Sequence, residues 1–268
     1  RGLGDVYKRQ GGKSIMGMKR FFKKELYEIV KTHKVIVIPS VFLTFGLLSP
    51  LLARYMPEIL MATVPDAVNI ELPEPVVLDA YDQLFKNLNQ IALLVTVLTV
   101  MGTVVGEKIK GTATLVLTKS VSRFQFIISK FLANGILFTL ALILAYIGCM
   151  YYTSILFSGF YMYHLWLSFF LFWLYGMFLI AITIFASTIS GSHILAAVLS
   201  FMGYTLVNLL AFAPVIGRYS PGALGRFSTG LLNGSKSPGD VMATVLITLL
   251  LSGLTIGLSV LVFEKQEL

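Results

Sequence analysis

Long apolar runs separated by short polar stretches are the main pattern along this chain. Each run approaches the roughly 20 residues that a helix needs to cross a hydrocarbon core of about 30 Å. The runs occupy residues 35–52, 84–105, 126–151, 165–185, 194–213 and 241–263. A helix satisfies its own backbone hydrogen bonds, which lipid cannot do. The pattern therefore predicts an all-α membrane protein with six transmembrane helices, in which Pro50 ends the first span.

The segment 18–34, ahead of the first run, has an amphipathic pattern instead. Apolar and basic residues fall on opposite faces of a helix: Phe21, Phe22, Leu26, Ile29 and Val30 against Lys19, Lys23, Lys24, Lys31 and Lys34. Such basic amphipathic helices lie in the membrane interface. We expect a surface helix that continues without a break into the first span, with a plain solvated helix as the alternative.

Charge in the loops predicts the orientation. The segment 54–82 is acidic and rich in proline, whereas 18–34 and 106–125 are basic. Because Lys and Arg are enriched in cytoplasmic loops, the amino terminus is expected in the cytoplasm, and six spans return the carboxyl terminus to the same side. Three basic residues of the fifth loop oppose this trend, namely Arg218, Arg226 and Lys236. Near the start of the second span, Lys86, Asn87, Asn89 and Gln90 indicate an interfacial helix end, although the amides can also face a bundle interior.

The segment 218–239, before the last run, mixes glycine and proline with apolar residues. It predicts either short helices that dip back into the membrane or a loose external loop. Ser237 and Asp240 have capping-box spacing and should open the last helix. Within that helix, Gly253 and Gly257 form a G-x-x-x-G pair, which permits close helix packing but also arises readily by chance.

Composition supports the membrane class and narrows the partners. Hydrophobic residues make up 56% of the 268 residues, charged residues 13%, and the mean hydropathy is +0.83. Charged residues alone are about a quarter of a soluble domain. The net charge of +8 comes from basic residues beside the apolar runs, so no nucleic-acid partner is expected. The single cysteine, Cys149, excludes an internal disulfide and is expected to be a free buried thiol.

The first ten residues, RGLGDVYKRQ, match the translation of a common sequencing adapter. We therefore expect 1–15 to be non-native or disordered, with Met16 or Met18 as the start and 16–268 as one six-helix domain. A phosphate-binding loop ending in Gly-Lys-Ser would also need glycine at position 7, which is Tyr7. The chain thus has no recognisable ATP site, and no cofactor is expected.

The stretch 107–123 is a polar, basic island between two apolar runs. Its first charges should end the preceding run by Gly106, because each costs roughly 2.5 to 3.5 kcal/mol at a bilayer centre. The apolar residues of 112–117 predict a short helix with a docking face. Acidic protein surface or anionic lipid headgroups are the expected contacts of its basic side chains, Lys108, Lys110, Lys119 and Arg123.

The island reads Glu-x-x-x-Gly-Thr-x-x-x-x-Leu-x-x-Ser-x-Ser-Arg. With the surface helix, six spans and the re-entrant-like segment, it resembles the ABC-2 family of exporter permeases over 18–268. Family members often have Pro where Ser120 stands, which puts only the local turn in doubt. The resemblance implies a permease of the bacterial plasma membrane that works with a separate ABC ATPase and a second permease copy or paralogue, surrounded by membrane lipids. It also implies an ATPase-coupling role for Glu107, Gly111, Thr112, Leu117 and Arg123.

Two other functions stay open from the residues. A membrane anchoring or assembly subunit would share this topology without transporting anything. An intramembrane enzyme is less well supported, because His33, His164 and His193 lie near predicted span ends and neither G-x-S-x-G nor H-E-x-x-H occurs. Lipids, polysaccharides, peptides and drugs are all cargo of the family, and these residues do not distinguish among them.

Overall fold

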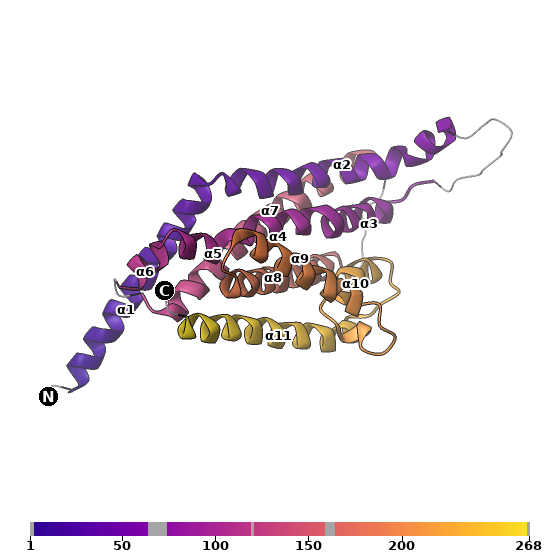
Figure 1. Ribbon diagram of the computed structural model, residues 1–268. Helices are drawn as coiled ribbons and strands as arrows, with labels where there is room; N and C mark the ends of the chain where they lie inside the picture. Colours follow the sequence, from indigo (N-terminus) through magenta and orange to yellow (C-terminus); the bar gives the residue numbers. More distant parts are fainter. Residues whose placement is uncertain (1–2, 64–73, 119–120, 159–163, 267–268) are drawn as a thin grey trace.

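The computed structural model describes residues 3–63, 74–118, 121–158 and 164–266, and the side chains from Gly17 onward. The chain is 86% helical and has no strand in the described part (Figure 1). In chain order the elements are α1 (Leu3–Lys31), α2 (Lys34–Thr63), α3 (Val77–Asn87), η1 (Leu88–Ala92), α4 (Leu93–Val100), α5 (Gly102–Ile109), α6 (Thr112–Leu117), α7 (Arg123–Leu156), α8 (Leu165–Ile189), α9 (His193–Leu210), η2 (Gly217–Tyr219), α10 (Ala223–Leu232) and α11 (Pro238–Lys265).

Six helical segments of the described chain are long and apolar enough to cross a membrane. They are α2, the continuous segment α3–α5, α7, α8, α9 and α11. The all-α, six-span prediction is therefore confirmed. In Figure 1, α1, α6 and the carboxyl end of α11 gather at one end of the bundle, called here the α6 end, and η2 and α10 lie at the opposite, α10 end.

Helix α8 forms the centre of the bundle, because 72% of the residues in its most apolar 18-residue stretch are buried. Its Gly176 gives close access to α7, because a Cβ atom there would lie 2.1 Å from the Phe138 ring. Rings from α3 fill the other side, with Phe85 and Phe169 centroids 4.9 Å apart. By contrast, only 17% of the residues in the corresponding stretch of α9 are buried, and 22% in that of α11. These two helices therefore each leave a broad apolar face uncovered within one chain.

The first span does not end at Pro50, because α2 continues to Thr63 through three prolines. Membrane helices tolerate proline where neighbouring helices compensate for the lost backbone bond. Here α2 packs closely on α7: a Cβ atom on Gly46 would lie only 2.4 Å from the Ala145 carbonyl oxygen. This packing supports α2 in the turn just before Pro50.

Helix α1 meets α2 at a break, so the predicted continuous helix is wrong there. His33 takes a left-handed conformation, with φ 59°. Of the predicted apolar face, Phe21 and Ile29 are buried, whereas Val30 is 56% exposed. Helix α1 starts at Leu3, and the expectation that 1–15 is non-native or disordered stays a prediction.

The second span starts earlier than Leu84, at Val77, and includes a π-helical turn, η1. Two of its amides, those of Asn87 and Asn89, face the bundle, whereas Gln90 is exposed. Asn87 Nδ2 donates to Ser49 Oγ at 3.0 Å. The backbone carbonyl of Asn89 accepts from the Tyr204 hydroxyl at 2.8 Å. A π-turn frees such carbonyls, which then find partners on other helices.

The last loop contains the short helices that one of the two predictions gave, and their dip into the membrane stays a prediction. Helix α10 buries residues such as Leu224 and Leu231, and the Ser237–Asp240 capping box is present, with Ser237 N donating to Asp240 Oδ2 at 2.8 Å. A Cβ atom on Gly253 or Gly257 would meet no atom within 4 Å. This pair therefore makes no helix contact within the described chain, and its packing role stays a prediction for contacts with another copy.

Candidate functional site

The predicted island lies at the α6 end and consists of the end of α5, a turn and the short helix α6. Helix α5 stops at Ile109, Gly111 takes φ 66°, and α6 follows as the predicted short helix. A left-handed residue is costly for any amino acid with a Cβ atom, so glycine suits this turn. The Thr112 hydroxyl donates to the Glu107 carbonyl at 3.3 Å, which ties α6 back onto α5. Lys119 and Ser120 lie outside the described residues.

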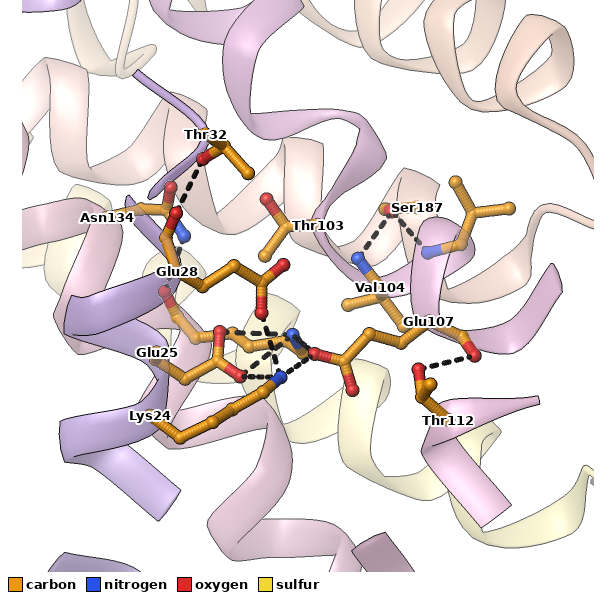
Figure 2. A network of polar contacts seen from close by, with 12 residues as sticks. Lys24, Glu25, Glu28, Thr32, Thr103, Val104, Glu107, Thr112, Asn134 and Ser187 are labelled. Atoms are coloured by element: carbon orange, nitrogen blue, oxygen red, sulfur yellow. Dashed lines mark hydrogen bonds and ion pairs between the residues drawn. The ribbon is translucent and has the colours of Figure 1, made fainter. Parts of the chain in front are cut away.

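Glu107 is buried in a cluster of charged side chains, not exposed on the loop surface (Figure 2). The charge cluster comprises Lys24, Glu25 and Glu28 of α1, Glu107 of α5 and Lys130 of α7. Lys130 Nζ lies 2.8 Å from Glu107 Oε1 and 3.1 Å from Glu25 Oε2. Lys24 pairs with Glu107 as well and lies 2.8 Å from Glu28. Three helices that are distant in sequence thus meet through their charges.

Burial makes each partner in the charge cluster dependent on the others. Lys130 is 0% exposed and Glu25 is 3% exposed. A buried charge is strongly destabilising unless an opposite charge pairs with it. Desolvation raises the pKa of Glu25, although the two neighbouring lysines oppose this shift. Burial disfavours the charged form of Lys24, but its carboxylate neighbours, Glu25 first, outweigh this and raise its pKa.

Three carboxylates of the cluster have a spacing compatible with a metal ion. Oxygen atoms of Glu25, Glu28 and Glu107 lie within 4.8 Å of one another. However, Lys24 and Lys130 place two ammonium groups between them, and metal sites for hard cations use oxygen ligands without competing cations. The donor set therefore fits an ion-pair cluster rather than a metal centre.

A stack of aromatic rings lies beside the charge cluster. Phe21 of α1 stacks on Phe126 of α7 at 5.2 Å, and Phe126 stacks on Phe263 of α11 at 5.0 Å. Lys130 Nζ lies 4.8 Å from the centre of the Phe126 ring, a favourable cation–π position. The stack extends the connection between α1 and α7 to the last helix.

Arg123 binds the end of α11. Its Nη1 donates to the carbonyl of Phe263, to that of Glu264 at 2.7 Å and to that of Gln266 at 2.9 Å. The last carbonyls of a helix lack partners within it, and a cation there is favourable. Arg123 therefore caps α11 within the chain, which is a third role beside the contacts with protein or lipid expected from the sequence.

Lys108 performs the same task for α8. Its Nζ donates to the carbonyls of Thr188 and Ser190, both at 2.8 Å. From the same helix end, the Ser187 hydroxyl accepts from the backbone N–H groups of Val104 and Val105, at 3.1 and 3.0 Å. Both N–H groups lie in the first turn of α5, just after the one-residue gap at Met101 that separates α5 from α4. Helices α5 and α8 are thus joined in both directions.

The outward surface of the loop is small and partly apolar. Leu115 is 65% exposed and Ile109 is 54% exposed, and with Lys110, Gly111 and Thr114 they form what is called here the α6 tip. Ala113 is buried, and Leu117 is partly buried against the core. Of the predicted coupling residues, only Gly111 therefore belongs to the tip, while Glu107, Thr112, Leu117 and Arg123 make contacts within the chain.

Sequence reasoning missed Glu25, Lys130 and Ser187. A signal existed for the first two. Glu25 is four residues from both Phe21 and Ile29, on the apolar face of α1, and Lys130 lies inside the third apolar run. A charge at such positions requires a partner. Nothing in the sequence indicates that the Ser187 hydroxyl would accept hydrogen bonds from a helix more than eighty residues away.

This arrangement is that of a polytopic helical membrane protein whose charged side chains connect its helices beneath a short exposed helix at one end. Residues 20–268 match the family model described as ABC-2 family transporter protein, and the chain belongs to this family. This confirms the resemblance and supports a general role as the membrane component of a transporter.

The chain is also similar to an uncharacterized transmembrane protein, YxlG, of Bacillus subtilis strain 168, with 27% identity over 143 residues. The match covers 53% of this chain and 55% of that protein, which is about half of each.

Proposed function

We propose that this chain is the permease subunit of an ATP-driven exporter, and that a separate ABC ATPase binds the α6 tip. The observation that carries the proposal is an exposed apolar side chain, Leu115, on a six-residue helix that is held firmly from below. Exposed apolar residues at a loop with basic neighbours favour a protein contact. Family membership supports a partner that binds ATP.

Movement of the α6 tip would reach most of the bundle through the contacts already described. Helix α6 is tied to α5 by Thr112, and α5 is joined to α1 and α7 by the charge cluster and to α8 by Lys108 and Ser187. Packed helices move as units rather than deforming continuously. We infer that ATPase closure tilts these helix ends together and so alternates access to the cargo path.

The predicted coupling residues receive different parts in this scheme. Gly111 shapes the turn that presents the tip, and Thr112 and Leu117 hold α6 in place. Glu107 transmits its movement to α1 and α7, and Arg123 to the end of α11. In this proposal they act as positioning residues beneath the ATPase contact.

Orientation and assembly follow from the same reasoning. The basic residues of α1 and of the island favour a cytoplasmic α6 end, with both chain termini on that side. We propose that two permeases assemble with two ATPases. The apolar faces of α9 and α11, and the Gly253–Gly257 pair on α11, are available for lipid and for a second permease copy.

The test is a single charge at the α6 tip, Leu115→Asp, with Val30→Asp as the matched control. Val30 is an apolar residue of α1 with a similar exposure, 56% against 65% for Leu115. Each variant is co-expressed with the ABC ATPase encoded beside the gene, and the ATPase retained on the purified permease is measured.

Because burying a leucine contributes roughly 1.5–3 kcal/mol, Leu115→Asp should lower ATPase retention and permease-stimulated hydrolysis by tenfold or more. Val30→Asp should leave both unchanged. Full retention by the Leu115 variant, or the absence of any such ATPase, would contradict the proposal.

A further inference from the structure

A cavity of about 470 Å³ opens at the α10 end, away from the α6 tip. Its wall is formed by the segment 211–214 after α9 and by residues of α10 and of the turn that follows. Ligand pockets usually have volumes of about 300–1,000 Å³, so this one is large enough for a small headgroup. Three basic side chains line it, namely Arg218, Arg226 and Lys236.

These three cations have no carboxylate within ion-pair distance in the described part of the chain. Arg218 Nη2 donates to the Tyr219 hydroxyl at 2.6 Å, and Arg226 Nη2 donates to the Ala211 carbonyl. A guanidinium has five N–H donors, so most of them stay available. Asp240 lies one turn from Lys236 in sequence, but its Oδ2 accepts from Ser237 N at 2.8 Å and Ser237 Oγ at 2.9 Å.

Aromatic rings hold the cations at the cavity. Arg226 lies 4.8 Å from the ring centre of Phe212 and Lys236 lies 5.6 Å from that of Phe227. All four of these residues line the cavity. The cationic groups therefore occupy defined positions around one space, which distinguishes them from isolated surface lysines.

An exposed apolar edge adjoins the cationic cavity. Phe212 is 72% exposed, Val215 74% and Ile216 65%. Phe212 belongs both to this edge and to the cavity wall. A single molecule in contact with both surfaces needs an anionic head and an apolar tail, which is the chemistry of an acidic phospholipid.

We propose that this cavity binds the phosphate of an anionic phospholipid, whose acyl chains lie along Phe212, Val215 and Ile216. Guanidinium groups bind phosphate oxygens through paired N–H donors, and a lysine adds a point charge. This site also accounts for the basic residues that oppose the charge trend of the loops, since a bound phosphate would neutralise them. The proposal does not depend on ATPase coupling or on the direction of transport.

The test uses a tryptophan placed at the apolar edge. The chain has two tryptophans, Trp166 and Trp173, which line a different cleft. Replacing both with Phe and introducing Phe212→Trp gives a single reporter beside the cavity. The full-length protein is reconstituted in phosphatidylcholine vesicles that contain brominated phosphatidylglycerol or, at the same mole fraction, brominated phosphatidylcholine. Bromine quenches tryptophan fluorescence on contact.

We expect brominated phosphatidylglycerol to bind at the reporter more than about fivefold more strongly than brominated phosphatidylcholine, because each juxtamembrane basic residue typically contributes about a fivefold preference. Arg218→Gln with Lys236→Gln should lower this preference at least about fivefold while leaving Arg226 and its hydrogen bond to Ala211 in place. The control, Lys19→Gln with Lys23→Gln, removes the same charge from exposed positions of α1 and should leave the preference unchanged.

Equal quenching by the two lipids would overturn the proposal. So would a preference that the cavity substitutions leave undiminished, or one that is lowered equally in the α1 control, since bulk charge would then explain the attraction. A large excess of glycerol 3-phosphate should not displace the lipid. Displacement would show that the cavity binds a free phosphate ester and that the apolar edge contributes nothing.

Discussion

Replacing Lys130 with methionine should destabilise the protein strongly, because it removes the central cation of the charge cluster. Methionine keeps most of the side-chain volume and loses the charge. Lys130 is 0% exposed, with Nζ 2.8 Å from Glu107 and 3.1 Å from Glu25. The two carboxylates would then share Lys24, whose side chain is 41% exposed.

The expected magnitude follows from these distances. At 3.1 Å and an effective dielectric constant of about 20, one ion pair has a Coulomb energy of about 5 kcal/mol. Desolvation of the ions offsets much of this, and breaking a buried pair typically costs about 3–5 kcal/mol. Taking about 3 kcal/mol, the melting temperature of a chain of this size should fall by about 6–12 °C.

The single cysteine provides the assay. Cys149 is buried and free, so a thiol-reactive fluorophore labels it only when α7 opens. Heating the detergent-solubilised protein with such a dye gives an apparent melting temperature. The matched variant combines Lys130→Met with Glu25→Gln and Glu107→Gln, which leaves the 2.8 Å Lys24–Glu28 pair balanced and should recover most of the loss.

Two results would refute this reasoning. A fall of less than about 2 °C for Lys130→Met, below the shift for 1 kcal/mol, would show that the charge cluster contributes little to stability. An equal fall in the triple variant would show that the loss arises from packing, because no unpaired buried charge remains there.

Three further changes have expected outcomes, two in the same melting assay and one in hydrogen exchange. Gly111→Ala forces a side chain into a turn with φ 66° and should cost about 1–2 kcal/mol, whereas Gly253→Ala, in an open helical position, should be neutral or stabilising. Arg123→Gln removes the cap of α11 and should increase hydrogen exchange in 260–266, with partial recovery in Arg123→Lys. Ser187→Ala leaves two N–H groups of α5 without their acceptor and should cost about 1–3 kcal/mol; Ser259→Ala, which affects a hydroxyl bound to its own helix, should change little.

Outcomes opposite to these would be informative in each case. A stable Gly111→Ala variant would mean that the turn relaxes to another conformation. Unchanged exchange in Arg123→Gln would mean that the carboxyl end of α11 is held by its other contacts, the ring stack and the hydrogen bond from Gln266 to Thr188. An equal loss in Ser187→Ala and Ser259→Ala would assign both effects to side-chain volume rather than to the cap between α5 and α8.

The sequence was sufficient for the class, the number of spans and the short helix α6. These depend on local properties: the length of apolar runs, a glycine before a short apolar stretch, and a capping box at Ser237. It was also sufficient for the family, because the pattern around Glu107 and the order of elements are both properties of the chain read in order.

Helix boundaries were less predictable, since they depend on neighbours. Pro50 reads as a terminator, yet contact between Gly46 and Ala145 carries α2 past it. Asn87 reads as an interfacial residue, yet a serine of α2 provides a partner inside the bundle. A helix end or a polar side chain is stable wherever the surrounding helices satisfy it.

What only the tertiary structure decided is which charges are buried and what they bind. From the sequence alone, Glu107, Lys108 and Arg123 were charges on an exposed loop. In the folded chain the first pairs with Lys130, and the other two cap α8 and α11. The physical reason is that an ion pair or a helix cap depends on distances of about 3 Å between atoms, and those distances are set by helix packing between segments far apart in sequence. Composition and periodicity report how much of the chain enters the membrane, but only packing determines which polar groups meet.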